Sequence, residues 1–185
     1  MTARDQIIET TCALMELQGY HATGLNEIIQ RSGSPKGSLY YYFPGGKEAL
    51  TAEALEHVGR IVLERIRTHL AHDPDPAVTI PAFIRQVARA VEATAYRTGG
   101  PITTVALETA ATSERLRAVC DQIYTGWQEA VAEALRAGGF DAPRAHRLSV
   151  AVIAALEGGI ILARTQHSPE PLNLIADEIG RLIAC

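Results

Sequence analysis

The chain has 185 residues, 47% of them hydrophobic, and its 17 basic and 21 acidic side chains leave a net charge of −4. This composition is typical of a globular protein with a substantial core, and it excludes a nucleic-acid binder that relies on a broad basic surface. Residues 1–20 place Asp5, Glu9 and Glu16 among periodic apolar positions, which predicts a folded helix rather than a signal peptide.

The three cysteines, Cys12, Cys120 and Cys185, lie far apart and have no metal-ligand spacing. They are therefore expected to be reduced thiols in a cytoplasm. Cys12 is expected in the core. A redox-sensing role stays open for Cys120 or Cys185, although neither has a basic neighbour that would favour its thiolate.

Three helices are predicted before residue 44. Apolar residues recur on one side of residues 4–17, and this helix should stop at Gly19. A second short helix is expected over residues 25–32, and Gly33-Ser34 turns the chain into a third. A helix, a short helix, a tight turn and another short helix form the helix-turn-helix arrangement, whose last helix enters the DNA major groove.

The third helix is expected over residues 35–43, with Ser34 as its N-cap and the sequence Pro44-Gly45-Gly46 as its end. Leu39 and Phe43 fall on one side of this helix as an i,i+4 pair. So short a helix is unstable alone in water, so these two side chains must dock on a neighbouring element.

The opposite side of the third helix carries Gly37, Ser38 and Tyr41. Gly37 allows close approach of another molecule, and the hydroxyl groups can donate hydrogen bonds to phosphate oxygens. Ordinary amphipathic packing is an alternative explanation for Tyr40 or Tyr42 alone. It does not explain the cap, the glycine and the exposed hydroxyls together.

One pattern of residues extends over residues 4–50, and it comprises Ile7-Ile8, Gly19-Tyr20, Thr23, Ile28, Gly33, Lys36-Gly37, Leu39-Tyr40, Phe43 and Lys47-Glu48-Ala49-Leu50. The pattern resembles the DNA-binding domain of the TetR family of transcriptional regulators. Residues 20–29 and 35–48 further resemble the LmrA/YxaF-type branch, whose members repress drug-efflux genes.

The resemblance implies a helix-turn-helix DNA-binding domain over residues 1–46 and a larger helical ligand-binding and dimerisation domain over residues 47–185. It implies a repressor that a small hydrophobic effector releases from a palindromic operator in double-stranded DNA. The alternative is a dimeric DNA-binding regulator without an effector, controlled by a protein partner or by its abundance. The residues implied to contact DNA are Asn26, Pro35, Lys36, Gly37, Ser38, Tyr40, Tyr41, Tyr42 and Lys47.

The charge of the N-terminal part limits how it can hold DNA. Residues 1–50 carry four basic and five acidic side chains, a net of −1. Phosphate contacts must therefore come from a few placed donors, helix N-termini and hydroxyl groups. We expect a shallow dependence of operator affinity on salt.

Every segment after residue 46 is predicted to be helical and none to be a strand, so the expected fold is all-α. The helix that begins at Lys47 is expected to be the only mechanical connection between the two domains. The helices are expected over residues 47–72, 78–98, 102–111, 113–137 and 142–166, and a last one follows Pro169 and Pro171 and ends near Ile183.

Residues 148–163 are apolar on nearly every face. A membrane span is not expected, because the run is shorter than the roughly 20 residues that a bilayer needs and contains Glu157. A soluble helix of this kind needs neighbours on both sides, which predicts a homodimer through a four-helix interface with the last helix. The residues expected in that interface are Ala151, Ala155, Gly158, Gly159, Leu162, Ile175 and Ile179.

The middle helices mix large apolar side chains with scattered hydrogen-bonding groups, as small-molecule pockets do. Simple core packing is the alternative for each of these residues, and Glu108 could instead pair with Arg115 or Arg117 on the surface. The effector site is thus implied mainly by the resemblance. Its expected residues are Phe83, Val87, Tyr96, Thr104, Leu107, Glu108, Tyr124 and Trp127.

Catalysis is not expected. The six histidines show no HExxH-like or Cys/His spacing, and no nucleophile stands with a base or a carboxylate pair. No metal and no cofactor are predicted.

Overall fold

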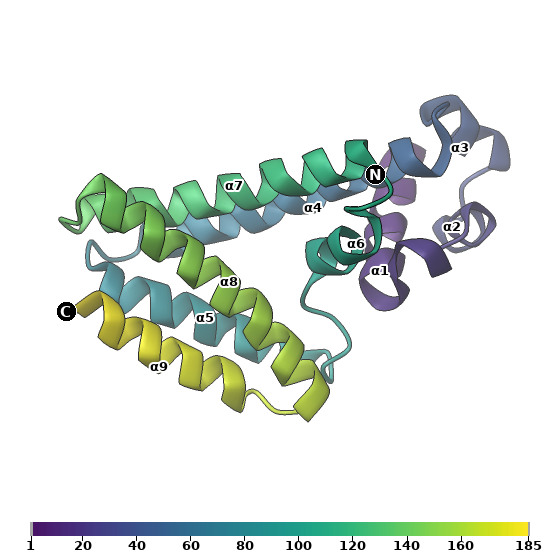
Figure 1. The fold of residues 1–185 in the computed structure, drawn as a ribbon. Coiled ribbons are helices and arrows are strands. Elements are labelled where there is room, and N and C mark those ends of the chain that lie inside the picture. The colour runs from purple at the N-terminus through teal and green to yellow at the C-terminus, as the bar shows by residue number, and fades with distance from the viewer. Residues whose placement is uncertain (1, 185) are drawn as a thin grey trace. The chain divides into compact units, whose positions relative to one another are not determined.

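The computed structural model describes residues 2–184, and within them it has nine helices and no strand (Figure 1). The all-α prediction is confirmed. The helices are α1 (Ala3–Ala22), α2 (Leu25–Ser32), α3 (Lys36–Tyr42), α4 (Gly46–Leu70), α5 (Pro76–Ala93), α6 (Pro101–Thr109), α7 (Glu114–Ala137), α8 (Ala142–Gln166) and α9 (Glu170–Ala184).

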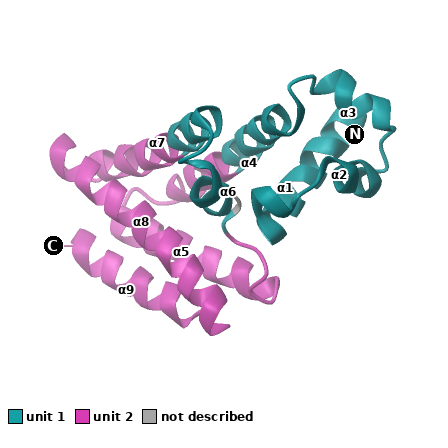
Figure 2. Cartoon of the chain, turned by 45° about the vertical axis from the view of Figure 1, so that its right-hand side comes forward, with its two compact units in different colours: residues 1–61, 100–123 teal, residues 62–99, 124–185 magenta. Residues whose placement is uncertain are grey.

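The chain forms two compact units (Figure 2). Unit 1 comprises Met1–Ile61 and Gly100–Ile123, and unit 2 comprises Val62–Gly99 and Tyr124–Cys185. The first part of α4, all of α6 and the first part of α7 thus pack with the N-terminal helices. The chain crosses between the units within α4, between α5 and α6, and within α7, so the helix from Lys47 is not the only covalent connection. The functional division at residue 46 stays a prediction.

A hydrophobic core holds the three N-terminal helices against the start of α4. It forms because α1 and α2 each turn an apolar face inward, as their sequence periodicity predicts. α1 begins with a capping box in which Thr2 and Asp5 satisfy each other's backbone N–H groups. The buried members of this core are Ile7, Ile8, Leu14, Ile28, Leu39, Phe43, Leu50 and Ala54.

α1 does not end at Gly19, as the sequence predicts, but bends there. Gly19 adopts φ 83° and ψ 176°, and one further helical turn continues to Ala22. The left-handed φ is open to glycine because it has no Cβ. The hydroxyl of Thr23 donates to the Gly19 carbonyl at 2.7 Å, and the Thr23 N–H donates to the Tyr20 carbonyl at 3.2 Å. These bonds close the last turn.

α3 begins one residue later than predicted. Pro35 is its N-cap, and Ser34 does not cap the helix. The Ser34 side chain is buried, and its hydroxyl donates to the carbonyl of Ala3 at 3.4 Å. Ser34 therefore ties the turn to the start of α1 instead of satisfying the N–H groups of α3.

Unit 2 is built from α5, α8 and α9 with the second parts of α4 and α7. Asp75 and Asp141 cap α5 and α8, and each is followed by a proline in the first turn. α5 ends at Ala93, earlier than predicted, because Ala95 and Tyr96 have φ of 50° and 61° and cannot continue it.

α8 packs against α9 and α5, and it buries Leu148, Val152, Leu156 and Ile160 on that side. Its 25 residues are long and apolar enough to cross a membrane by length and composition alone. The apolar run is thus part of a longer helix than the sequence suggests. Core helices of soluble proteins have the same length and composition, and α8 has a core face of this kind.

Candidate functional site

α3 separates an anchoring face from an exposed face, as predicted. Leu39 and Phe43 are buried in the core described above. Tyr41 is 79% exposed, and Tyr40 and Tyr42 are also exposed. The rings of Tyr41 and Tyr42 meet edge to face with centroids 5.1 Å apart. Three aromatic rings with hydroxyl groups therefore stand on a firmly anchored helix.

The rest of this exposed face offers a donor and a close approach. Pro35, Lys36 and Gly37 are exposed and Ser38 is half-buried. No atom lies within 4 Å of the position that a Cβ on Gly37 would take. A helical glycine costs about 1 kcal/mol relative to alanine, and internal packing gives no reason for it here. The absent side chain instead leaves the backbone open to a molecule from outside.

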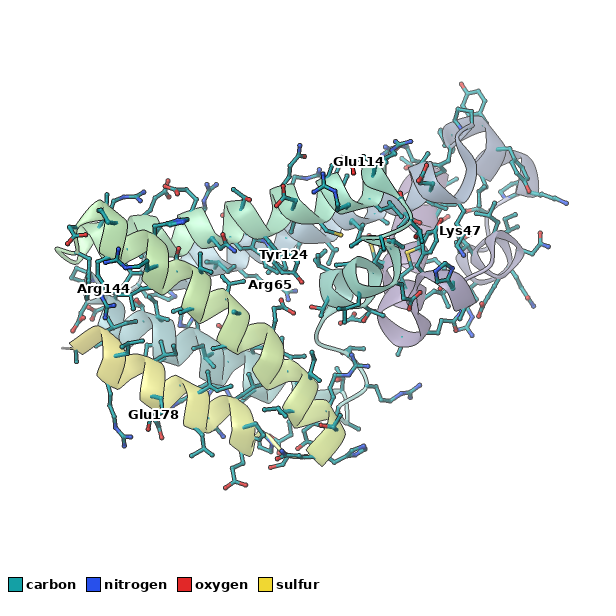
Figure 3. All side chains as sticks on the ribbon, viewed as in Figure 1. Lys47, Arg65, Glu114, Tyr124, Arg144 and Glu178 are labelled. Carbon is teal, nitrogen blue, oxygen red and sulfur yellow. The ribbon has the colours of Figure 1, made fainter. Side chains whose placement is uncertain are left out.

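Asn26 of α2 is exposed, whereas Lys47 of α4 is half-buried against the end of α1 (Figure 3). The Nζ of Lys47 lies 3.5 Å from the carbonyl oxygen of His21, to which it donates, and 4.3 Å from the centroid of the Tyr20 ring. Burial lowers the pKa of Lys47, and the carboxylate of Glu108 opposes that shift. Lys47 is therefore held by three groups of the protein itself.

Two family models match the chain. Residues 7–54 match the bacterial regulatory proteins of the tetR family, and residues 76–178 match the C-terminal domain of LmrA/YxaF-like transcriptional regulators. The chain belongs to the TetR family of transcriptional regulators. The exposed face of α3 thus lies within the DNA-binding region of a transcriptional regulator.

Relatives match over nearly their whole length. The uncharacterized HTH-type transcriptional regulator YxaF of Bacillus subtilis (strain 168) is 41% identical over 98% of this chain and 95% of its own. The HTH-type transcriptional regulator LmrA of the same organism is 39% identical over 98% and 96%. This class of protein is not enzymatic, as the sequence predicts.

Solved structures share the fold. A TetR transcriptional regulator from Legionella pneumophila has a TM-score of 0.87 at 17% identity, covering 98% of this chain and 97% of its own. The regulatory protein TetR from Rhodobacter sphaeroides has a TM-score of 0.86 at 22% identity, covering 97% of each chain. The expected division into a helix-turn-helix part and a larger helical part agrees with this likeness.

The eight residues expected around an effector are divided between the two units. Phe83 and Trp127 are buried, and the rings of Tyr124 and Trp127 meet edge to face at 5.4 Å. A groove of about 460 Å³ between α5 and α9 contains none of the eight. The pocket stays a prediction. Phe83, Val87, Tyr96, Tyr124 and Trp127 belong to unit 2, and Thr104, Leu107 and Glu108 belong to unit 1.

Glu108 differs most from its expected role. Its Oε2 accepts a hydrogen bond from the backbone N–H of His21 at 2.8 Å, so the carboxylate faces α1. It does not pair with Arg117, which binds Glu114 instead. Sequence analysis overlooked this contact because 87 positions separate its partners. No local pattern announces such a pair.

The expected dimer residues do not all face outward. A Cβ on Gly159 would lie 2.7 Å from side-chain atoms of Leu172 and Ile175, and Ile179 is buried. Gly159 therefore lets α9 of the same chain approach α8, which corrects its expected role. Gly158 has no atom within 4 Å of its Cβ position. Ala151 and Leu162 are exposed, and Ala155 and Ile175 are half-buried.

Two of the three thiols are shielded. Cys12 donates its Sγ–H to the carbonyl of Ala54 at 3.2 Å, and burial raises its pKa to about 12. Burial also raises the pKa of Cys120 to about 11. Neither side chain is a thiolate near neutral pH, which argues against redox sensing by Cys120. Cys185 lies outside the described residues.

We expect Tyr41 and Leu39 to separate DNA binding from folding. Tyr41→Phe should weaken operator binding by about tenfold, since a hydrogen bond to a charged group contributes about 1.5–3 kcal/mol, and should leave stability unchanged. Leu39→Ala should lower the free energy of unfolding by about 2–5 kcal/mol. Urea unfolding and fluorescence anisotropy with operator DNA measure the two effects. Equal loss of stability in both variants would contradict the assignment of faces.

The shielded thiols should make the protein less stable in alkali. The folded state keeps Cys12 and Cys120 protonated while the unfolded chain releases both protons above the ordinary pKa of 9.0. Stability should therefore fall as the pH rises from 9 to about 11. Urea unfolding against pH measures this. The variant Cys12→Val, Cys120→Val is the control and should show a smaller fall.

Proposed function

We propose that the protein is a dimeric repressor that leaves a palindromic operator when a small hydrophobic effector binds. The observation that carries this proposal is the face of α3, where Lys36, Gly37 and three tyrosines stand exposed over the buried pair Leu39 and Phe43. Side-chain hydroxyls, an ammonium group and an open backbone are suited to phosphates and base edges in a major groove.

The other residues proposed to contact DNA have different degrees of freedom. Asn26 is exposed on α2 and can reach a base or a phosphate. Lys47 must turn away from His21 and Tyr20 to meet the DNA backbone, or it acts by fixing the end of α1. The tyrosines and Lys36 therefore make the main contacts.

Homodimerisation is supported by an apolar stripe on the side of α8 away from its core. Val150, Ile161 and Leu162 are each more than a third exposed, and Ala151 and Ala154 lie between them at helical spacing. Leu174 and Leu182 are exposed on α9. Two copies joined through these helices would bury a stripe that is costly to leave in water. TetR-family regulators usually act as dimers with small-molecule effectors.

A dimer explains both the operator and its release. Two copies of α3 would lie about 34 Å apart and read successive major grooves, so the operator should be roughly palindromic. Effector binding favours a state in which α4 tilts and the spacing of the two α3 helices changes. The effector can shift this equilibrium only by its differential affinity for the two states. The protein acts where its DNA is, in the cytoplasm.

The proposal is tested by selecting operators from random DNA and then screening hydrophobic ligands against the complex. The selected sites should be palindromic, and at least one ligand should lower operator affinity by about 5–150-fold. The slope of log K against log salt should be much shallower than about −10, since the N-terminal part carries little net charge. Operators without two-fold symmetry, or ligands that bind tightly yet leave operator affinity unchanged, would count against it.

The interface should be sensitive to a charge at Leu162. Leu162→Glu should weaken dimerisation by more than about a hundredfold, because an unpaired charge in a buried contact costs about 3–5 kcal/mol. Leu17→Glu is the matched control, since Leu17 is a similarly exposed leucine on α1. Sedimentation equilibrium measures both. A stable dimer in the Leu162 variant would rule out this face.

A further inference from the structure

The last turn of α1 contains an amide group that the helix itself cannot satisfy. In an uninterrupted helix the N–H of His21 would donate to the carbonyl of Leu17, four residues before it. Gly19 interrupts this pattern with its φ of 83°. The N–H of His21 donates instead to Oε2 of Glu108 at 2.8 Å. The bend thus creates a donor, and α6 supplies the acceptor.

Gly19 is matched to Glu108 in space as well as in backbone conformation. A Cβ at Gly19 would collide with the side-chain Oε1 of Glu108. Gly19 itself is buried, and α6 packs along α1 within unit 1. The carboxylate therefore occupies the place that any other residue at position 19 would fill.

The same carboxylate acts on Lys47, one of the residues proposed to contact DNA. Lys47 donates to the His21 carbonyl and lies over the Tyr20 ring, so it contacts the turn whose N–H Glu108 holds. The negative charge of Glu108 also favours the charged form of this ammonium group. Glu108, the turn at residues 19–22 and Lys47 form one connected group, which we name the α1 latch.

α6 is placed to carry a signal to the latch because of its connections in the chain. Gly99 belongs to unit 2 and Gly100 to unit 1, so α6 follows directly from a unit 2 segment. In unit 2, Arg164 of α8 donates to the carbonyl of Arg97 at 3.1 Å and fixes that segment. A change in unit 2 that moves residues 94–99 is therefore transmitted by the backbone to α6.

We propose that Glu108 is a positioning residue that couples α6 to the end of α1, so that displacement of α6 by an effector moves the DNA-contacting helices. This inference rests on the proposed function, since it names the route by which effector binding reaches the DNA. It assigns Glu108 to transmission of the signal and removes it from the effector site. A hydrogen bond from an amide to a carboxylate is stronger than one between neutral groups, which suits a coupling contact.

The test compares Glu108→Ala with Glu108→Gln and with Glu114→Ala. Glu108→Gln keeps an oxygen acceptor for His21 but loses the charge. Glu114→Ala removes an exposed carboxylate of unit 1 that pairs only locally with Arg117. For each variant, operator affinity is measured with and without effector, effector affinity is measured on the free protein, and thermal unfolding is recorded.

Glu108→Ala should reduce the effector-induced loss of operator affinity by about tenfold, as expected when a charge-assisted hydrogen bond is removed. Effector affinity and the unfolding temperature should stay as in the parent protein. Glu108→Gln should recover part of the coupling, and Glu114→Ala should behave as the parent. Loss of effector binding in Glu108→Ala would place Glu108 in the ligand site and overturn the inference, as would unchanged coupling or a general loss of stability.

A second measurement needs no effector. Hydrogen exchange of the His21 amide should be about tenfold faster in Glu108→Ala, while the amide of Leu14 in the same helix keeps its rate. If no ligand releases the parent protein from DNA, the proposed function fails, and this measurement still decides the latch. Equal exchange of His21 in the parent and in Glu108→Ala would overturn it.

Discussion

Burial of Leu39 and Phe43 is the interaction on which the functional surface of this protein depends. α3 has only seven residues, and a helix of that length does not persist in water. Its two apolar side chains enter the core formed with α1, α2 and the start of α4, and this fixes the direction of everything on the other side. Tyr41 can be 79% exposed and still well placed, because the opposite face is fully buried. The ring of Phe43 is further covered by the guanidinium of Arg4, which also pairs with Glu53 of α4.

The bend at Gly19 shows how a local backbone feature becomes a long-range contact. A glycine in left-handed conformation breaks one helical hydrogen bond, and the free amide is satisfied by a carboxylate from α6. A buried or half-buried amide without a partner is costly, so the contact holds α6 against α1. Ser113 and Glu48 form a second polar link in unit 1, at 2.5 Å, between the residue before α7 and the first turn of α4. The N-terminal helices are thus joined by polar contacts to segments from the middle of the chain, and this is why unit 1 includes residues 100–123.

α8 illustrates why an apolar helix has more than one explanation. Its length and composition would suit a membrane, but one side packs on α5 and α9. The other side leaves Val150, Ile161 and Leu162 exposed. The two adjacent glycines have different roles: Gly159 admits α9 of the same chain, and Gly158 faces open space. A single helix can therefore complete the fold of one chain and present a surface to a second.

The sequence alone determined the family, the all-α class, the buried and exposed faces of α3 and most helices to within a few residues. These features depend on local periodicity, caps and breakers, which neighbouring residues encode. Tertiary structure decided what the sequence left open: Ser34 binds Ala3 instead of capping α3, Gly159 packs on α9, and Glu108 binds the backbone of His21. Each of these depends on which distant segments meet. A carboxylate 87 positions from its partner carries no local signal, since its role is set by the path of the whole chain between them.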